Sequence, residues 1–172
     1  MNKVILILAT IFSVSCSSDD TKTTVSPPAN NFVSNINVNL QSFQPSNNAD
    51  HLYTTLTSGI NNGAANQRIF YLRQVDNSLN SGNATMSVII TYPSTQASIN
   101  GTYTFSTSNL ASNSVAGGQF STDSYVYNFK SGNVTVTDLG SNNFKIEFYN
   151  AKIGPFGSLE LPVTGFFNGR FY

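Results

Sequence analysis

His51 is the only histidine in the chain and the side chain best suited to acid–base chemistry near neutral pH. Because Asp50 precedes it and serine is abundant, a serine–histidine–aspartate hydrolase is one hypothesis for its role. The surrounding sequence NNADHLY is typical of a loop that enters a strand, and no nucleophile stands at a fixed spacing from the histidine. We therefore interpret His51 as a structural residue and keep a hydrolase built on it as a second alternative function.

Carboxylate pairs offer another route to hydrolysis, as in glycosidases. The candidates are Asp123, Asp138, Glu147 and Glu160. Glu147 and Glu160 occupy the polar positions of alternating segments, and Lys145 shares the face of Glu147, so a solvated strand face accounts for both glutamates. A carboxylate-pair enzyme joins the second alternative, and no catalytic residue is predicted.

Metal and cofactor sites are not predicted either. Zinc sites are built from clustered histidines and cysteines, and the chain has one of each. The segment DLGSNN (138–143) offers oxygen ligands, but it holds one carboxylate and lacks the spacing of an EF-hand loop. We interpret this segment as a turn.

Aromatic residues are the remaining resource for binding, with 13 Phe, 8 Tyr and no Trp. Most of them alternate into the predicted core. Tyr149, Phe166 and Tyr172 fall off the core phase, and Arg170 shares the phase of the last two. Tyrosine rings beside polar side chains can stack on sugars and hydrogen-bond to them. These four residues are therefore the predicted binding surface.

Residues 1–15 read MNKVILILATIFSVS, with a basic start at Lys3, an apolar run and small residues at the end. The run is shorter than the roughly 20 apolar residues that a bilayer-spanning helix needs. The pattern predicts a secretory signal peptide, which is excluded from the fold.

Cys16 is the only cysteine and follows this segment directly, so an internal disulfide is excluded. The stretch resembles the lipobox of bacterial lipoproteins, in which the cysteine is acylated and becomes the new N-terminus. Ser15 and Val14 match that pattern, whereas Ser13 stands where the family usually has an aliphatic residue. Ser13 and Ser15 also suit ordinary signal peptidase, which would cut the same bond. Lipidation at Cys16 is predicted, with an unmodified cysteine as the alternative.

The residues after the cysteine are Ser17, Ser18, Asp19 and Asp20. This start is similar to that of surface lipoproteins of glycan-degrading, gliding Gram-negative bacteria, in which acidic residues near the anchor act as an export signal. The resemblance implies a lipid-anchored protein of the outer membrane at the cell surface. The periplasmic face and secretion are the alternatives.

Residues 16–31 are rich in Ser, Thr, Pro and Asn, which predicts a flexible tether after the anchor. Residues 32–172 then form a single domain. Charged residues make up 9% of the chain and the formal net charge is +0. Nucleic-acid binding is not expected, because it depends on basic surface that neutralises phosphates.

Apolar and polar residues alternate with period two in many short segments separated by Asn, Gly, Ser and Pro, which is typical of half-buried strands. The segments are 36–40, 67–74, 85–92, 101–105, 124–129, 132–150 (a hairpin) and 157–172. Their core faces include Leu40, Tyr125 and Leu159. Pro162 predicts an edge strand or a bulge, since proline has no N–H. Residues 106–118 are interpreted as a long loop or one helical turn.

These strands predict an all-β fold, an antiparallel β-sandwich, with an up-and-down, lipocalin-like barrel as the alternative. The segments GTYTF, SGNVTVTDLGSNNFKIEFYNA and VTGFFNGRFY resemble small single-domain lipoproteins of the same bacterial group. The resemblance implies a sandwich fold and no established activity.

The first functional hypothesis is a membrane-anchored, non-enzymatic binding or accessory module of the cell envelope. It is expected to bind the membrane through its lipid, and a glycan or an envelope protein through its domain. The alternative is a lipocalin-like carrier of a small apolar ligand, motivated by the many Phe and Tyr residues.

Overall fold

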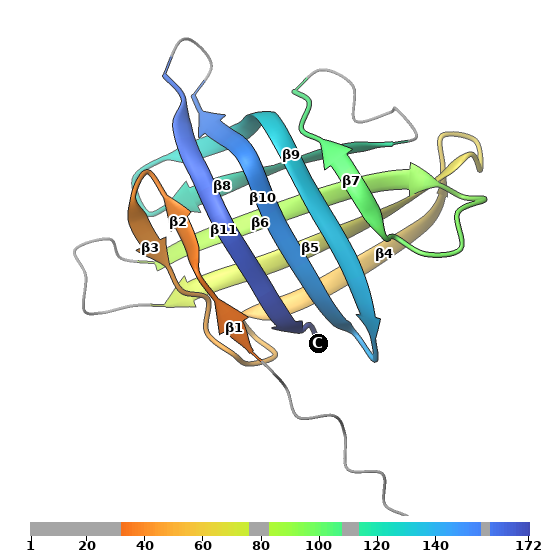
Figure 1. Ribbon diagram of the computed structural model, residues 1–172, viewed down its shortest axis with the longest axis horizontal. Helices are drawn as coiled ribbons and strands as arrows, with labels where there is room; N and C mark the ends of the chain where they lie inside the picture. Colours follow the sequence, from red (N-terminus) through yellow and green to blue (C-terminus); the bar gives the residue numbers. More distant parts are fainter. Residues whose placement is uncertain (1–31, 76–82, 108–113, 156–158) are drawn as a thin grey trace, which may run out of the picture.

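The computed structural model describes residues 32–75, 83–107, 114–155 and 159–172, and every regular element in these ranges is a β-strand (Figure 1). The predicted signal peptide, Cys16, the export signal and the tether lie outside the described residues. The strands are β1 (Val33–Ser34), β2 (Ile36–Val38), β3 (Gln41–Phe43), β4 (Leu52–Ile60), β5 (Ala65–Val75), β6 (Asn83–Pro93), β7 (Gly101–Thr104), β8 (Val115–Thr122), β9 (Val126–Gly140), β10 (Asn143–Gly154) and β11 (Leu161–Arg170).

The strands form one sheet in the order β3-β2-β11-β10-β9-β8-β6-β5-β4, in which all neighbours are antiparallel. In addition, β1 pairs with β11 and β7 pairs with β9. The sheet folds over itself, so that β7, β10 and β11 lie in a front layer whose strands cross β4, β5 and β6 of the back layer at a steep angle (Figure 1). The predicted antiparallel sandwich is confirmed, and its two layers belong to a single open sheet.

The sheet folds over on itself within the long strand β9. Its first residues, from Val126 to Asn128, pair with β8, whereas Asn133 to Val136 pair with β7. Strand β10 follows this bend, and its register against β9 shifts between Tyr149 and Lys152. Bulges of this kind bend a strand and increase its twist, which lets one sheet supply both layers.

The space between the layers is filled by aromatic and aliphatic side chains. One cluster joins Phe70, Phe144 and Phe171, with Phe70 ring centroids 5.0 Å from both partners. A second cluster is a stack in which Phe129 lies 4.1 Å from Phe105. Full burial of a phenylalanine contributes about 1.5–3 kcal/mol, so these rings supply much of the free energy of folding.

The alternating pattern predicted most of this core correctly. On β6, the side chains of Met86, Val88, Ile90 and Tyr92 are buried as expected. The predicted hairpin is also confirmed: β9 and β10 meet at a tight turn with positive φ at Ser141. Period-two alternation therefore indicates the inward face wherever the strand is covered by the other layer.

Three residues predicted on the core side are exposed instead. Leu40 is 90% exposed, because it lies with positive φ in the turn between β2 and β3. Tyr125 precedes β9 in a turn, and Leu159 precedes β11, so neither follows the phase of its strand. Of the two alternatives predicted from Pro162, the edge position is wrong, because β1 and β2 cover the side of β11 opposite to β10, whereas the β10–β11 pairing does shift register nearby, between Phe148 and Ala151.

Strand β8 corrects the interpretation of residues 106–118. Residues 108–113 lie outside the described ranges, but Val115 begins a strand that pairs with β6. Gly118 lies against the backbone of Ser87, where a Cβ atom would overlap the carbonyl oxygen. Close backbone approach therefore explains the glycine at position 118.

The end of the chain lies against the open edge of the sheet. The amide of Tyr172 donates to the carbonyl of Leu52 (3.0 Å), and the amide of Thr54 donates to the carbonyl of Tyr172 (3.4 Å). These bonds connect the C-terminal end of β11 to the edge strand β4. Within the described ranges, no helix is long and apolar enough to cross a membrane.

Candidate functional site

The predicted binding surface lies on the outside of the front layer, but it divides into separate spots. Phe166 packs beneath Lys145, whose Nζ lies 5.5 Å from the ring centroid. Arg170 lies four residues further along β11, at a distance of about 13 Å, and its guanidinium covers the ring of Tyr172. Tyr149 stands exposed on β10. The four residues share a surface without forming one aromatic platform.

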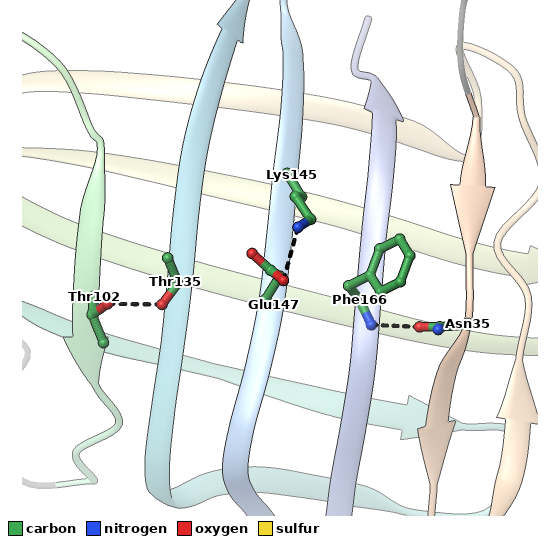
Figure 2. A network of polar contacts seen from close by, with 6 residues as sticks. All are labelled: Asn35, Thr102, Thr135, Lys145, Glu147 and Phe166. Carbon is green, nitrogen blue, oxygen red and sulfur yellow. Dashed lines mark hydrogen bonds and ion pairs between the residues drawn. The ribbon is translucent and has the colours of Figure 1, made fainter.

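The centre of this surface is a row of polar contacts across the front layer (Figure 2). Thr102 and Thr135 share a hydrogen bond of 2.7 Å between their hydroxyls, and Glu147 pairs with Lys145 at 2.9 Å. At the other end, the amide of Phe166 donates to Oδ1 of Asn35 (2.7 Å). The side chains of the row bond to one another or to the backbone, which explains the threonines and asparagines of this face.

His51 lies in the turn that leads into β4, as its sequence context predicts. Its Nδ1 is 2.9 Å from Nδ2 of Asn48, and the backbone amide of Asp50 donates to Oδ1 of the same asparagine (3.1 Å). The histidine thus contacts an amide that also accepts a backbone hydrogen bond within the turn.

The four candidate carboxylates each have a local partner. The aspartates accept backbone amides: Asp123 from Asn83 (3.3 Å) and Asp138 from Gly140 (2.8 Å). The glutamates pair with lysines, and Lys152 bonds to Glu160 at 2.7 Å. This bond lowers the pKa of the Glu160 carboxyl below its ordinary value, and the positive charge of the lysine adds to the effect. In the part of the chain that the structure describes, no group of three or more metal-binding side chains occurs.

A groove of about 730 Å³ lies between the β2–β3 and β8–β9 hairpins. We call it the mouth groove. It is lined by Val38, Asn39, Gln41, Ser42, Phe43, Gln74, Ala84, Phe120, Thr122, Asp123, Ser124, Tyr125, Tyr127 and Leu161. Aromatic rings, uncharged polar groups and the carboxylate of Asp123 are among its lining groups.

The aromatic side of the mouth groove is held in place by packing. Phe43 and Phe120 are buried at its base in an edge-to-face pair with centroids 5.7 Å apart. Tyr125 and Tyr127 stack at 5.2 Å, with Tyr127 packed against the core and Tyr125 exposed. The groove therefore offers an exposed ring on a rigid base.

Hydrogen bonds fix the backbone and the polar groups around the mouth groove. The amide of Thr122 donates to the carbonyl of Tyr125 (2.9 Å), and its hydroxyl accepts the amide of Ser124 (3.3 Å). Gln74 points inward from β5 and is buried, and its Oε1 accepts the amide of Gln44 (2.6 Å). A buried amide held in this way presents its remaining hydrogen-bonding groups in a fixed direction.

A shallower hollow of about 330 Å³ lies over the back layer. Tyr53 and Tyr71 stack there at 4.5 Å, and Arg73 and Asp123 also line it. The sequence predicted neither hollow: Asp123 was a candidate only for a carboxylate pair, and Tyr125 was expected on a core face. The one signal available was the Tyr-x-Tyr pair directly after a turn, because such a pair places two rings on one side of a hairpin.

The comparisons with known proteins return no matching family model, no matching curated protein and no matching solved structure. Function is therefore inferred from the chemistry of the mouth groove and from the sequence signals at the beginning of the chain.

Proposed function

We propose that this protein is a membrane-anchored lipoprotein that acts as a non-enzymatic binding module of the cell envelope and holds a short saccharide in the mouth groove. The observation that carries the proposal is the combination of an exposed tyrosine with amide and hydroxyl side chains in one hollow of about 730 Å³. Small-molecule sites usually measure about 300–1,000 Å³. Sugars present apolar C–H faces and hydroxyl groups together, which this lining complements.

The alternative functions have less support in the geometry. A carrier of an apolar ligand needs room between the layers, and Phe70, Phe129 and Phe144 fill that region with close ring contacts. A hydrolase needs an available base, and His51 and the carboxylates contact local partners. The mouth groove needs no rearrangement of these contacts to admit a ligand.

The anchor is proposed from the sequence, because Cys16 lies outside the described residues. Incorporation of an alkyne-tagged fatty acid into the wild type and into Cys16→Ala, in a related Gram-negative host, tests it. Label in the wild type that is lost in the variant supports the lipoprotein. Unlabelled protein in the growth medium contradicts it and indicates ordinary cleavage after Ser15.

Saccharide binding is tested with the mature protein on a glycan array, followed by calorimetry with the saccharides that bind. Tyr125→Ala removes the exposed ring of the mouth groove and is expected to weaken binding about tenfold or more. Tyr149→Ala is the comparison variant, because this tyrosine is similarly exposed but belongs to the surface predicted from the sequence, outside the groove, so it separates the two candidate sites. Folded protein that binds no saccharide, or equal losses in both variants, would overturn the proposal.

A further inference from the structure

Arg68 faces the interior of the sandwich from β5. It shares the phase of Phe70 and Leu72, both of which are fully buried, whereas Arg73 on the opposite phase is exposed. Across the strand pair its neighbour is Leu56, whose side chain is about half exposed. Arg68 thus lies where the covered part of the back layer ends.

Packing explains part of this position. The Arg68 guanidinium carbon lies 5.1 Å from the ring centroid of Phe144, so the side chain caps the aromatic cluster of the core. Its Nε, however, is buried and has no hydrogen-bond partner within the described residues. A buried donor without an acceptor is unfavourable, and a cap made by an apolar side chain would avoid that cost.

This guanidinium borders a hollow of about 360 Å³, which we call the arginine hollow. Phe144, Arg170, Asp138 and the β9–β10 turn (140–142) complete its lining. That turn lies beside the C-terminus, whereas the mouth groove lies at the β2–β3 hairpin on the opposite side of the molecule (Figure 1). The arginine hollow is therefore separate from the mouth groove.

The charges around the arginine hollow favour an anion. Its lining includes two arginines, Arg68 and Arg170, and one acidic residue, Asp138. That carboxylate accepts the backbone amide of Gly140 at 2.8 Å, which orients it toward the turn. Guanidinium groups bind carboxylates and sulfates through paired hydrogen bonds.

We propose that the arginine hollow is a second binding site, specific for an oxyanion group, either a carboxylate or a sulfate, which accepts N–H groups of the Arg68 guanidinium. The group is carried by an acidic sugar or occurs as a free anion. This site does not depend on saccharide binding in the mouth groove, so either proposal can fail while the other stands.

The test is calorimetry of the full-length mature protein at low ionic strength with sodium sulfate, glucuronate and glucose. Sulfate or glucuronate is expected to bind, glucose is not, and ~0.5 M NaCl is expected to weaken binding strongly. Glucuronate that binds about tenfold more tightly than sulfate indicates an acidic sugar, whereas equal affinities indicate a free anion. If neither anion binds, the proposal is overturned.

Variants on one strand identify the site. Arg68→Gln is expected to weaken anion binding about tenfold or more, and Arg73→Gln, which removes the same charge on the exposed phase, is expected to change it less than about twofold. Equal losses in the two variants would show general attraction by charge and contradict the site. If Arg68→Gln does not fold, Arg68→Lys replaces it in the test, because lysine keeps the charge and the packing over Phe144. Arg68→Lys is expected to bind the anion more weakly than the wild type does. Saccharide binding that depends on Tyr125 is expected to persist in all three.

Discussion

Gly132 on β9 lies directly against the backbone of Asn150 on β10, at the bend where one layer continues into the other. A Cβ atom at position 132 would overlap the carbonyl oxygen of Asn150 and lie 2.5 Å from Cα of Ala151. Gly132 has φ +89 and Asn150 has φ +50, so both strands leave the extended conformation at the same point. The two-layer fold thus depends on a contact that admits no side chain.

Gly132→Ala is therefore expected to destabilise the protein severely. The substitution adds left-handed strain of about 1–3 kcal/mol and an overlap of backbone atoms that costs about 1–3 kcal/mol more. Gly140→Ala is the matched control, because Gly140 has φ +81 on the same strand but nothing within 4 Å of an added Cβ. Urea denaturation of both variants measures the difference. Equal losses of stability would show that the close contact at the bend is unimportant.

The stacked rings between the layers give a second prediction. Phe129 is 1% exposed, and its ring is nearly parallel to those of Phe105 and Phe148, at interplanar angles of 7° and 1°. Phe129→Ala is expected to lower the free energy of unfolding by about 3–5 kcal/mol, through lost burial and a cavity. Leu139→Ala, at an exposed position of the same strand, is expected to cost about 0.5 kcal/mol or less. A small loss for Phe129→Ala in denaturation experiments would mean that the stack is loosely packed.

Sequence patterns predicted the strands that have one covered face and a regular phase. They were accurate on β6 and on the β9–β10 hairpin, where alternation and turn residues indicate the same structure. They did not predict that β8 begins at Val115, because glycine is unfavourable inside a strand. Gly118 is explained only by the close backbone of Ser87, which the sequence does not show. The edge position predicted from Pro162 was wrong because the strands that cover β11 come from the beginning of the domain, far away in the sequence.

The candidate sites were harder to predict than the fold. The mouth groove brings Gln41, Gln74 and Tyr125 together from three separate segments, so only the topology makes them neighbours. Arg68 looked like an ordinary strand residue, because the sequence does not show that its inward phase ends at a partly covered edge. The predicted surface of Tyr149 and Phe166 used the correct phase, but phase does not give the separation between residues along a face.

The ion pair between Lys152 and Glu160 gives a prediction about pH. The hydrogen bond from Lys152 lowers the pKa of the Glu160 carboxyl, so Lys152→Met is expected to raise that pKa toward its ordinary value. The charge of Lys130 lowers the pKa of Glu160 by less, so Lys130→Met is expected to raise that pKa less than Lys152→Met does. Because the folded-state pKa is the lower one, the stabilisation is present above the unfolded-state pKa and is lost as pH falls through the folded-state value. Carbon-detected NMR titration of Glu160 measures these pKa values, and equal shifts in the two variants would contradict the direct pair.

Burial of Tyr103 gives the opposite dependence at alkaline pH. Desolvation raises the pKa of its phenol above the ordinary value of 10.0, and the hydroxyl donates to the carbonyl of Ile99 at 2.7 Å. Because the folded-state pKa is the higher one, the stabilisation is complete below the unfolded-state pKa and is lost as pH rises through the folded-state value. Tyr103→Phe is expected to cost about 1 kcal/mol at neutral pH, through the lost hydrogen bond, and to lose less stability than the wild type above pH ~10.

Thermal and urea denaturation of the wild type and Tyr103→Phe between neutral and alkaline pH measure both effects. Tyr149→Phe is the control at neutral pH, because its exposed side chain is expected to change the free energy of unfolding by about 0.5 kcal/mol or less. If the wild type and Tyr103→Phe lose stability in parallel as the pH rises, the buried phenol is not the group that titrates. A neutral effect of Tyr103→Phe at pH 7 would instead mean that water replaces the hydroxyl at the carbonyl of Ile99, because a buried carbonyl without a donor is costly.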